Sequence, residues 1–129
     1  MTQPRAWLDV TAVVIDALNH DWGGTVLPAV PHPRPDEFVV VRRTGGGHDG
    51  VLDRARVDVE IWSGQQGDSL VGVWSLTATI REYLRMMPTT TIGGSRVDES
   101  GVALLTDNES GAPRVLLSAI VWLVPTDPS

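Results

Sequence analysis

Residues 36–62, DEFVVVRRTGGGHDGVLDRARVDVEIW, carry the strongest strand signal in the chain. Two runs rich in β-branched residues flank a polar segment that contains glycine, which is the pattern of a β-hairpin. The first run, residues 38–41, is apolar on both faces, which favours a central strand. The second run alternates, so one of its faces is predicted to be buried and the other polar. The apolar face holds Val57, Val59 and Ile61, and the polar face holds Arg56, Asp58, Glu60 and Trp62.

The glycine cluster Gly45–Gly47 lies between the two runs, within a segment, residues 44–50, that is longer than a tight turn. We expect a flexible finger at the tip of the hairpin. A phosphate-binding loop is the alternative, but the cluster lacks the Lys-Ser/Thr pair of a Walker motif and joins two strands instead of entering a helix.

Amphipathic helices are predicted on both sides of the hairpin. The first spans residues 9–20, with Asp9 as its N-cap and the glycines after Trp22 as its end. The second runs from Asp68, its N-cap, to about Met87.

The remaining strands are weaker. A short edge strand is predicted within residues 25–30, where Pro28 interrupts the ladder. Two further strands, near residues 96–106 and 114–124, are joined by the turn-forming residues 107–113. The chain therefore predicts an α+β fold of order α-β-β-β-α-β-β, with two helices packed on a mainly antiparallel or mixed sheet of four to five strands. Residues 1–129 form one domain, with an N-terminal arm (1–8) and a C-terminal tail (125–129).

Composition narrows the functional classes. The net charge of −6 makes the chain a poor candidate for binding nucleic acid, because phosphate binding requires clustered lysine and arginine. The absence of cysteine excludes disulfides, thiol nucleophiles and cysteine zinc sites. No apolar run reaches the roughly 20 residues that span a bilayer, and the N-terminus does not read as a signal peptide, so a soluble protein made in the cytoplasm is expected.

No group of residues predicts catalysis. His20, His32 and His48 lack metal-ligand spacing. Asp58 and Glu60 share a strand face about 7 Å apart, a spacing that could serve glycoside chemistry, but nothing else converges on them and the solvated side of a strand is favoured. We therefore expect no catalytic residue, no cofactor and no metal site.

The hairpin instead has the character of a contact surface. Its arginines and carboxylates interleave, which suits a polar subunit boundary, although an ordinary mixed surface is the alternative. Trp7, Trp22 and Trp62 fall near element ends or on a polar strand face, where exposed aromatic side chains favour protein contacts. Trp74 and Trp122 are expected in the core.

Four segments follow one another in a recognisable order. These are PAVPHPRPDEFVVVRRTGGG (28–47), the strand ARVDVEIWS (55–63), the helix start GDSLVGVWSLTATIREYL (67–84) and the final strand RVLLSAIVWLV (114–124). After the N-terminal helix, this order resembles the small tail terminator (tail completion) proteins of siphophages and related prophages. The resemblance covers nearly the whole chain, and its motifs are structural.

The resemblance implies an α+β fold with a sheet flanked by helices, in a virion structural protein that is no enzyme. Such proteins form a hexameric ring at the head-proximal end of the tail, which ends polymerisation of the tail tube and joins it to the head–tail connector. The implied partners are further copies of the chain, the major tail tube protein and the connector or stopper protein, with no membrane. Assembly takes place in the host cytoplasm. Genomic DNA passes through the lumen without specific binding, and the acidic net charge suits that passage.

Within this scheme two groups of residues have expected roles. Asp58 and Glu60 are candidates for the lumen. The candidate subunit or partner interface comprises Arg42, Arg43, Thr44, Gly45, Gly46, Gly47, His48 and Trp62. A head-closure or neck protein of the same module, or a small ligand-binding or enzymatic α+β domain, are the alternatives.

Overall fold

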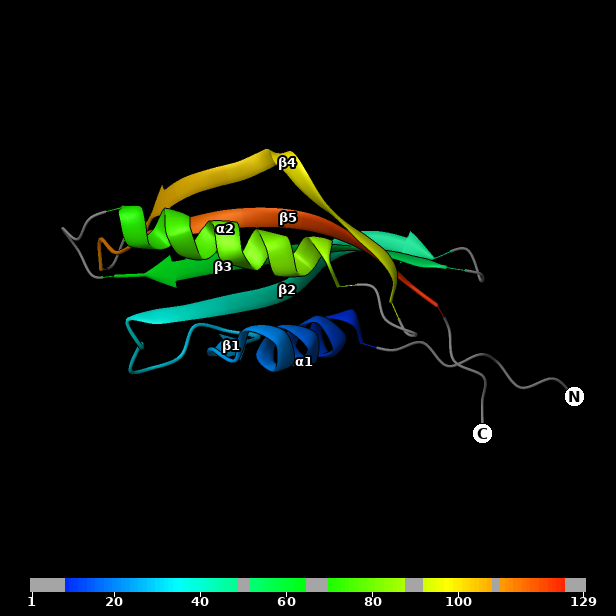
Figure 1. The fold of residues 1–129 in the computed structure, drawn as a ribbon, viewed down its shortest axis with the longest axis horizontal. Helices are drawn as coiled ribbons and strands as arrows, with labels where there is room; N and C mark the ends of the chain where they lie inside the picture. Colours follow the sequence, from blue (N-terminus) through cyan, green and yellow to red (C-terminus); the bar gives the residue numbers. More distant parts are fainter. Residues whose placement is uncertain (1–8, 49–51, 65–69, 88–91, 108–109, 125–129) are drawn as a thin grey trace, which may run out of the picture.

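The computed structural model describes residues 9–48, 52–64, 70–87, 92–107 and 110–124. Its elements, in chain order, are α1 (Val10–Trp22), β1 (Val26–Leu27), β2 (Glu37–His48), β3 (Asp53–Ser63), α2 (Val71–Arg85), β4 (Ile92–Thr106) and β5 (Pro113–Leu123). The α+β class and the order α-β-β-β-α-β-β predicted from the sequence are confirmed (Figure 1).

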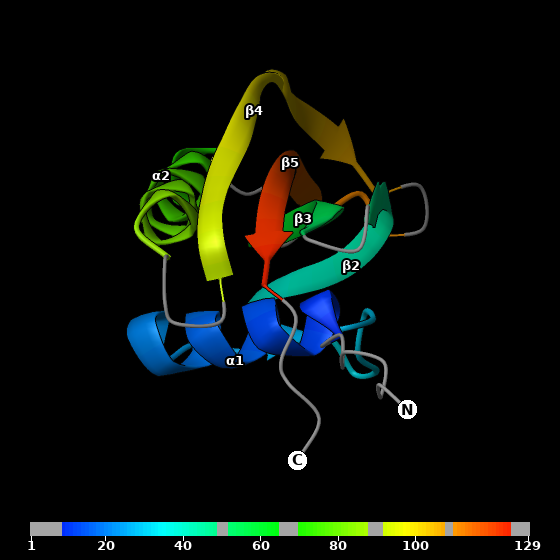
Figure 2. The ribbon, with the colours of Figure 1, turned by 90° about the vertical axis from the view of Figure 1, so that its right-hand side faces the viewer.

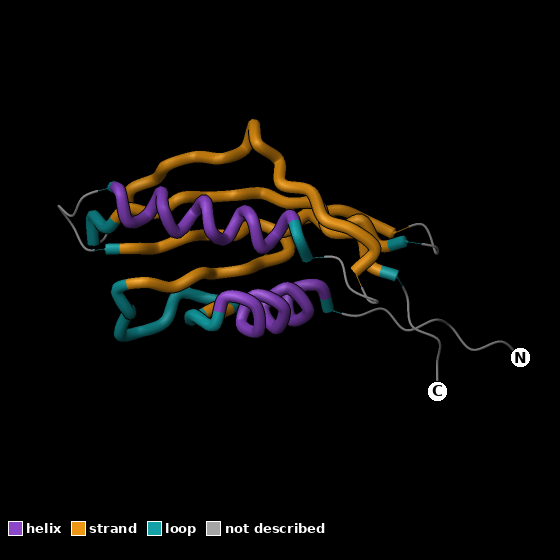
Figure 3. The backbone as a smooth tube through the Cα atoms, in the orientation of Figure 1, coloured by secondary structure: helices purple, strands orange, loops and turns teal. Residues whose placement is uncertain are grey.

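The described strands form one five-stranded sheet in the order β1-β2-β3-β5-β4. β1 runs parallel to β2, and the other neighbouring pairs are antiparallel. β2 therefore has a strand on each side, as its two apolar faces predicted, and the short β1 lies at the edge. β4 forms the other edge, and its register with β5 breaks between Asp98 and Ala103. The chain bends sharply along β4 (Figure 3).

Both helices cover the same face of the sheet (Figure 2). α1 begins after Asp9, whose carboxylate accepts a hydrogen bond from the Thr11 backbone N–H at 3.0 Å. It ends at Gly23, where φ is 79°, a left-handed conformation that favours glycine. The predicted N-cap of the second helix, Asp68, lies outside the described residues. In the part of the chain that is described, neither helix is long and apolar enough to cross a membrane.

The main core lies between the two helices and this face of the sheet. The predicted apolar face of β3, Val57, Val59 and Ile61, is fully buried in it. The helices contribute residues spaced three or four apart, which include Val10, Val14 and Leu18 of α1 and Val73, Ile80 and Leu84 of α2. Each buried aliphatic side chain contributes about 1.5–3 kcal/mol, so this layer fixes the helices on the sheet.

A smaller apolar cluster lies on the other face of the sheet. Phe38 and Trp62 stack with ring centroids 5.3 Å apart and an interplanar angle of 13°. Val40, Ala112 and the partly buried Val30 complete the cluster, which leaves Trp62 only 3% exposed. The prediction that Trp62 is an exposed aromatic contact is therefore wrong. The segment after β1 and the residues before β5 cover this face of β3, although the sequence of β3 predicts that the face is polar.

The glycine cluster is also placed differently from the prediction. β2 continues to His48, and Gly45, Gly46 and Gly47 pair with Arg56, Ala55 and Arg54 of β3. The register shifts between Arg43 and Gly45, so Thr44 is the extra residue of a β-bulge. The expected finger over residues 44–50 is thus wrong as far as His48, and residues 49–51 lie outside the described part of the chain. Within this cluster Gly46 lets the two strands approach closely, because a Cβ there would clash with backbone atoms of Arg54 and Arg56.

The other tryptophans depart from the predictions in a similar way. Trp74, expected in the core, is 41% exposed, because the helical period that turns Val73 towards the sheet turns the next residue away. Trp22 is partly buried against the main core. Trp122 is half-buried on the face opposite the helices, and Trp7 lies outside the described residues.

Candidate interaction surface

The face of the sheet opposite the helices gathers the polar side of the hairpin with side chains from two other strands. We call it the open face. Alternation and register assign to it Phe38, Val40, Arg42, Arg54, Arg56, Asp58, Glu60, Trp62, Arg96, Asp98, Ala103, Leu105, Arg114, Leu116, Ser118, Ile120 and Trp122. Among these residues five are arginines and three are carboxylates, so this face is not acidic although the chain carries a net charge of −6.

The two lumen candidates share the open face, as predicted. Asp58 accepts a hydrogen bond from the Ser118 hydroxyl at 2.9 Å and lies 4.0 Å from the guanidinium of Arg56. Glu60 accepts a hydrogen bond from the indole N–H of Trp62 at 3.4 Å and its side chain is 17% exposed. Because each carboxylate has a cationic neighbour, neither presents a bare negative charge. Their position in a lumen stays a prediction.

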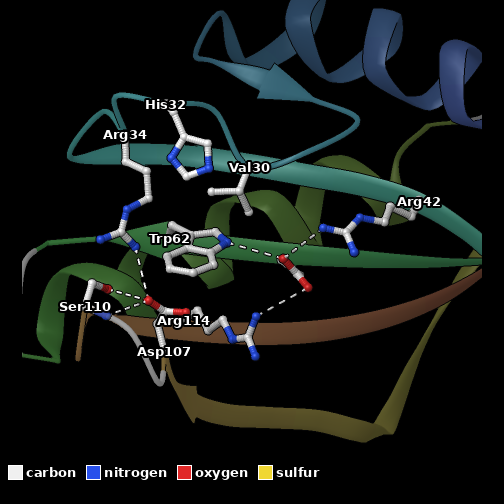
Figure 4. Close-up of a pocket in the computed structure, with 9 residues that line it drawn as sticks. Val30, His32, Arg34, Arg42, Trp62, Asp107, Ser110 and Arg114 are labelled. Carbon is white, nitrogen blue, oxygen red and sulfur yellow. Dashed lines mark hydrogen bonds and ion pairs between the residues drawn. The ribbon is translucent and has the colours of Figure 1, made fainter.

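A pocket of about 480 Å³ opens on the open face (Figure 4). We call it the arginine pocket. Its lining comes from the segment after β1, from β2, β3 and β5, and from the turn before β5, and comprises Val30, His32, Arg34, Arg42, Glu60, Trp62, Asp107, Ser110 and Arg114. Three arginines from three separate segments therefore converge on one cavity.

Trp62 organises the cations of the pocket. The guanidinium carbons of Arg34 and Arg114 each lie 5.4 Å from the centroid of its ring, within the range of cation–π attraction. Glu60 lies between the other charges, with its carboxylate oxygens 3.6 Å from Arg114 Nη1 and 3.9 Å from Arg42 Nη2. Arg114 Nε is buried and has no hydrogen-bond partner among the described residues.

Asp107 fixes the other end of the pocket. Its Oδ2 accepts hydrogen bonds from the Ser110 hydroxyl at 2.6 Å and from the Ser110 backbone N–H at 2.8 Å, and Arg34 Nη1 lies 3.5 Å away. The two bonds from Ser110, together with the charges of Arg34 and Arg114, hold the pKa of Asp107 below its ordinary value. The carboxylate is therefore ionised at neutral pH.

We expect Ser110→Ala to lower the free energy of unfolding at neutral pH and to have little effect in acid. A carboxyl group whose pKa is lower in the folded state stabilises the protein above its unfolded pKa of about 3.9, and this contribution disappears as the pH falls through the folded value. Urea unfolding of wild type and variant at neutral pH and at about pH 2, below both pKa values, measures the difference. A difference that does not change with pH would show that the hydroxyl acts through packing alone.

Arg43 does not belong to the open face. Its guanidinium donates to both carboxylate oxygens of Asp53 at 2.7 Å, and its backbone N–H donates to the Thr11 hydroxyl at 3.2 Å. The hydrogen bond with Asp53 raises the pKa of Arg43 above its ordinary value. Of the candidate interface residues, Arg42 and Trp62 line the pocket, whereas Arg43 is held on the helix side of the sheet by Asp53 and Thr11.

Three residues of the pocket, Asp107, Ser110 and Arg114, were not singled out as site residues by the sequence. Residues 107–113 carry a turn signal and Arg114 opens a strand, so nothing local associates them with the hairpin. The register of β5 against β3 makes the association, because it places Arg114 opposite Trp62. Sequence alone does not specify that register.

A second surface lies on the side of α2 that faces away from the sheet. Val71, Trp74 and Met86 are exposed by 75%, 41% and 65%, and a shallow hollow lined by Ala78, Thr79, Glu82, Tyr83 and Met86 continues it. We call Val71, Trp74, Ala78 and Met86 the α2 outer surface. Large apolar side chains exposed together on one helix are typical of protein contacts.

The chemistry available at these surfaces is ionic and apolar. Among the described residues, no three side chains of the metal-ligating types are grouped to hold a metal ion. The open face offers guanidinium groups, and the α2 outer surface offers tryptophan and aliphatic side chains. In comparisons with known proteins, no family model matches the chain and no curated protein sequence is significantly similar to it.

Proposed function

We propose that the protein is a tail terminator, a structural subunit that forms a ring on the tail tube of a phage, ends its polymerisation and joins it to the head–tail connector. The sequence resemblance is the first support. The second is the agreement between the observed order of elements and the α+β fold that the resemblance implies. The ring would consist of copies of this chain, and DNA would pass through it without specific binding.

The observation that carries the proposal is the placement of two unlike surfaces on opposite sides of the subunit. The α2 outer surface carries exposed apolar side chains beside the Glu82–Arg85 ion pair, the open face is rich in arginine, and the sheet and the helix layer lie between them. A contact between two different surfaces of identical subunits is heterologous, and heterologous contacts generate closed rings or filaments. Tryptophan, methionine and arginine are also the residue types enriched in protein interfaces.

Met86→Glu is the variant that tests self-association. We expect the wild type to sediment as a ring-sized oligomer and the variant to associate at least about tenfold more weakly, because a carboxylate buried in an apolar contact lacks a partner. Ala12→Glu is the matched control, since it adds the same charge at an exposed position of α1. Sedimentation velocity and negative-stain images compare the three proteins.

The terminator role itself is tested with tail tube protein. Added to polymerising tubes, the wild type is expected to shorten them and to appear at one end, whereas Met86→Glu leaves their length unchanged. A wild-type protein that stays monomeric and does not affect tube length would exclude the proposal. A protein that forms rings and binds the connector but ignores tube ends would instead be a neck protein of the same module.

A further inference from the structure

We propose that the arginine pocket is a binding site for an oxyanion, a carboxylate or phosphate group carried by a ligand. Arg34, Arg42 and Arg114 approach one cavity from the segment after β1, from β2 and from β5 (Figure 4). Guanidinium groups present planar sets of N–H donors that match two oxygens of a carboxylate or a phosphate. Three such groups around one cavity form the recognition chemistry of an anion site.

The protein's own carboxylates do not saturate these cations. Three guanidinium groups face two carboxylates, Glu60 and Asp107, so the pocket keeps a net positive charge. The oxygens of Glu60 lie 3.6 Å and 3.9 Å from Arg114 and Arg42, beyond hydrogen-bonding distance. Asp107 Oδ2 accepts two hydrogen bonds from Ser110 and a longer one, of 3.5 Å, from Arg34 Nη1, so it engages one nitrogen of one pocket arginine. Donors therefore remain available to an incoming anion.

Arg114 shows the clearest sign of a missing partner. Its Nε is buried without a hydrogen bond among the described residues, and an unpaired buried donor is costly. The Nη1 of the same guanidinium lies 3.6 Å from a carboxylate oxygen of Glu60. An oxyanion that entered beside Glu60 would reach the guanidinium of Arg114 and that of Arg42, whose side chain is half exposed and free to adjust.

The shape of the pocket favours a group larger than a single ion. Its volume of about 480 Å³ is larger than the volume that a few water molecules occupy. Val30 and Trp62 give it an apolar lining. A carboxylate or phosphate on a short organic stem matches this combination of charged rim and apolar wall. The group could belong to a free small molecule or to an acidic side chain of a neighbouring copy, and the two sources are distinguished below.

The first experiment titrates inorganic phosphate and citrate into the protein at constant ionic strength and follows thermal unfolding and heat of binding. The Met86→Glu background removes ring formation, so the result does not depend on the tail function. We expect a saturable rise in Tm, with affinity reduced at least about tenfold in Arg42→Gln and in Arg114→Gln. Arg96→Gln, on the open face but outside the pocket, is the matched control and should bind as the parent does.

The second experiment measures self-association of the same three arginine variants in the otherwise wild-type chain. If phosphate and citrate do not bind but Arg42→Gln weakens association and Arg96→Gln does not, the ligand is a carboxylate of the neighbouring subunit. If Arg114→Gln proves unfolded, Arg42→Gln decides, because its half-exposed side chain can be removed without opening the core. If Arg42→Gln changes neither the binding of phosphate and citrate nor self-association, the arginines only stabilise the fold and the proposal is overturned.

Discussion

Gly46→Ala is expected to lower the free energy of unfolding by about 3 kcal/mol or more, through the backbone strain of an unfavourable φ and overpacking against the neighbouring strand. Gly46 has φ of +84°, a conformation that L residues with a Cβ rarely adopt. A Cβ there would lie 2.0 Å from the carbonyl oxygen of Arg54 and 2.8 Å from the backbone nitrogen of Arg56. Both obstacles are backbone atoms, so β2 and β3 would have to separate.

Gly47→Ala is the matched control for this effect. A Cβ at Gly47 would meet no described atom within 4 Å, and its φ is outside the positive region. The substitution is expected to change stability by no more than about 0.5 kcal/mol, the range of ordinary surface changes. Urea unfolding of the two variants gives the comparison. Equal, small effects would show that residues 45–48 are not paired with β3 and would restore the flexible finger.

The glycine cluster illustrates how far the sequence alone can predict this fold. The period-2 alternation of residues 56–62 predicted correctly that Val57, Val59 and Ile61 enter the main core. The length of the hairpin arms could not be predicted in the same way. Glycine marks both flexible turns and positions where strands approach closely, and only the partner strand distinguishes them.

Trp62 and Trp74 show the same limit for burial. Each prediction rests on one element alone, which indicates an exposed polar strand face for Trp62 and the core for Trp74. Burial is decided by what covers that element. Residues before and after the hairpin cover Trp62, whereas the described residues leave Trp74 41% exposed. The sequence placed Arg42 in the candidate interface and Glu60 among the lumen candidates, and only the strand registers bring them together with Arg114 in one pocket.

The distribution of charge refines the ring proposal. The open face carries more arginines than carboxylates, while α1, on the other side of the sheet, carries Asp16 and Asp21 and has no lysine or arginine. A lumen that lets DNA slide requires a surface that does not attract phosphates. If the acidic charge of the chain serves that purpose, the outer side of α1 satisfies the requirement better than Asp58 and Glu60, whose charges are matched by neighbouring arginines. The arginine-rich face is then left for contacts between subunits.

Arg43→Met is expected to lower the free energy of unfolding by about 3 kcal/mol, because it breaks the ion pair between Arg43 and the buried carboxylate of Asp53. The Asp53 side chain is 4% exposed, and both of its oxygens accept hydrogen bonds from Arg43. Methionine retains the apolar stem of the side chain but leaves a buried carboxylate without its cation. The cost of the change is the desolvation of that carboxylate, and it exceeds the value of a surface ion pair.

Arg42→Met, one residue away on the same strand, is the control. Its side chain is half exposed and its ion pair with Glu60 spans 3.9 Å, so the expected loss is at most about 1 kcal/mol. The double variant Arg43→Met/Asp53→Leu should recover most of the loss, because it removes the unpaired charge together with its former partner. If the double variant is as unstable as Arg43→Met, the lost free energy of unfolding came from the packing of the Arg43 side chain and not from the unpaired charge of Asp53. The prediction of a larger loss for Arg43→Met than for Arg42→Met depends on Asp53 staying buried without its cation. Equal losses in the free energy of unfolding would therefore mean that solvent reaches Asp53 once Arg43 is removed.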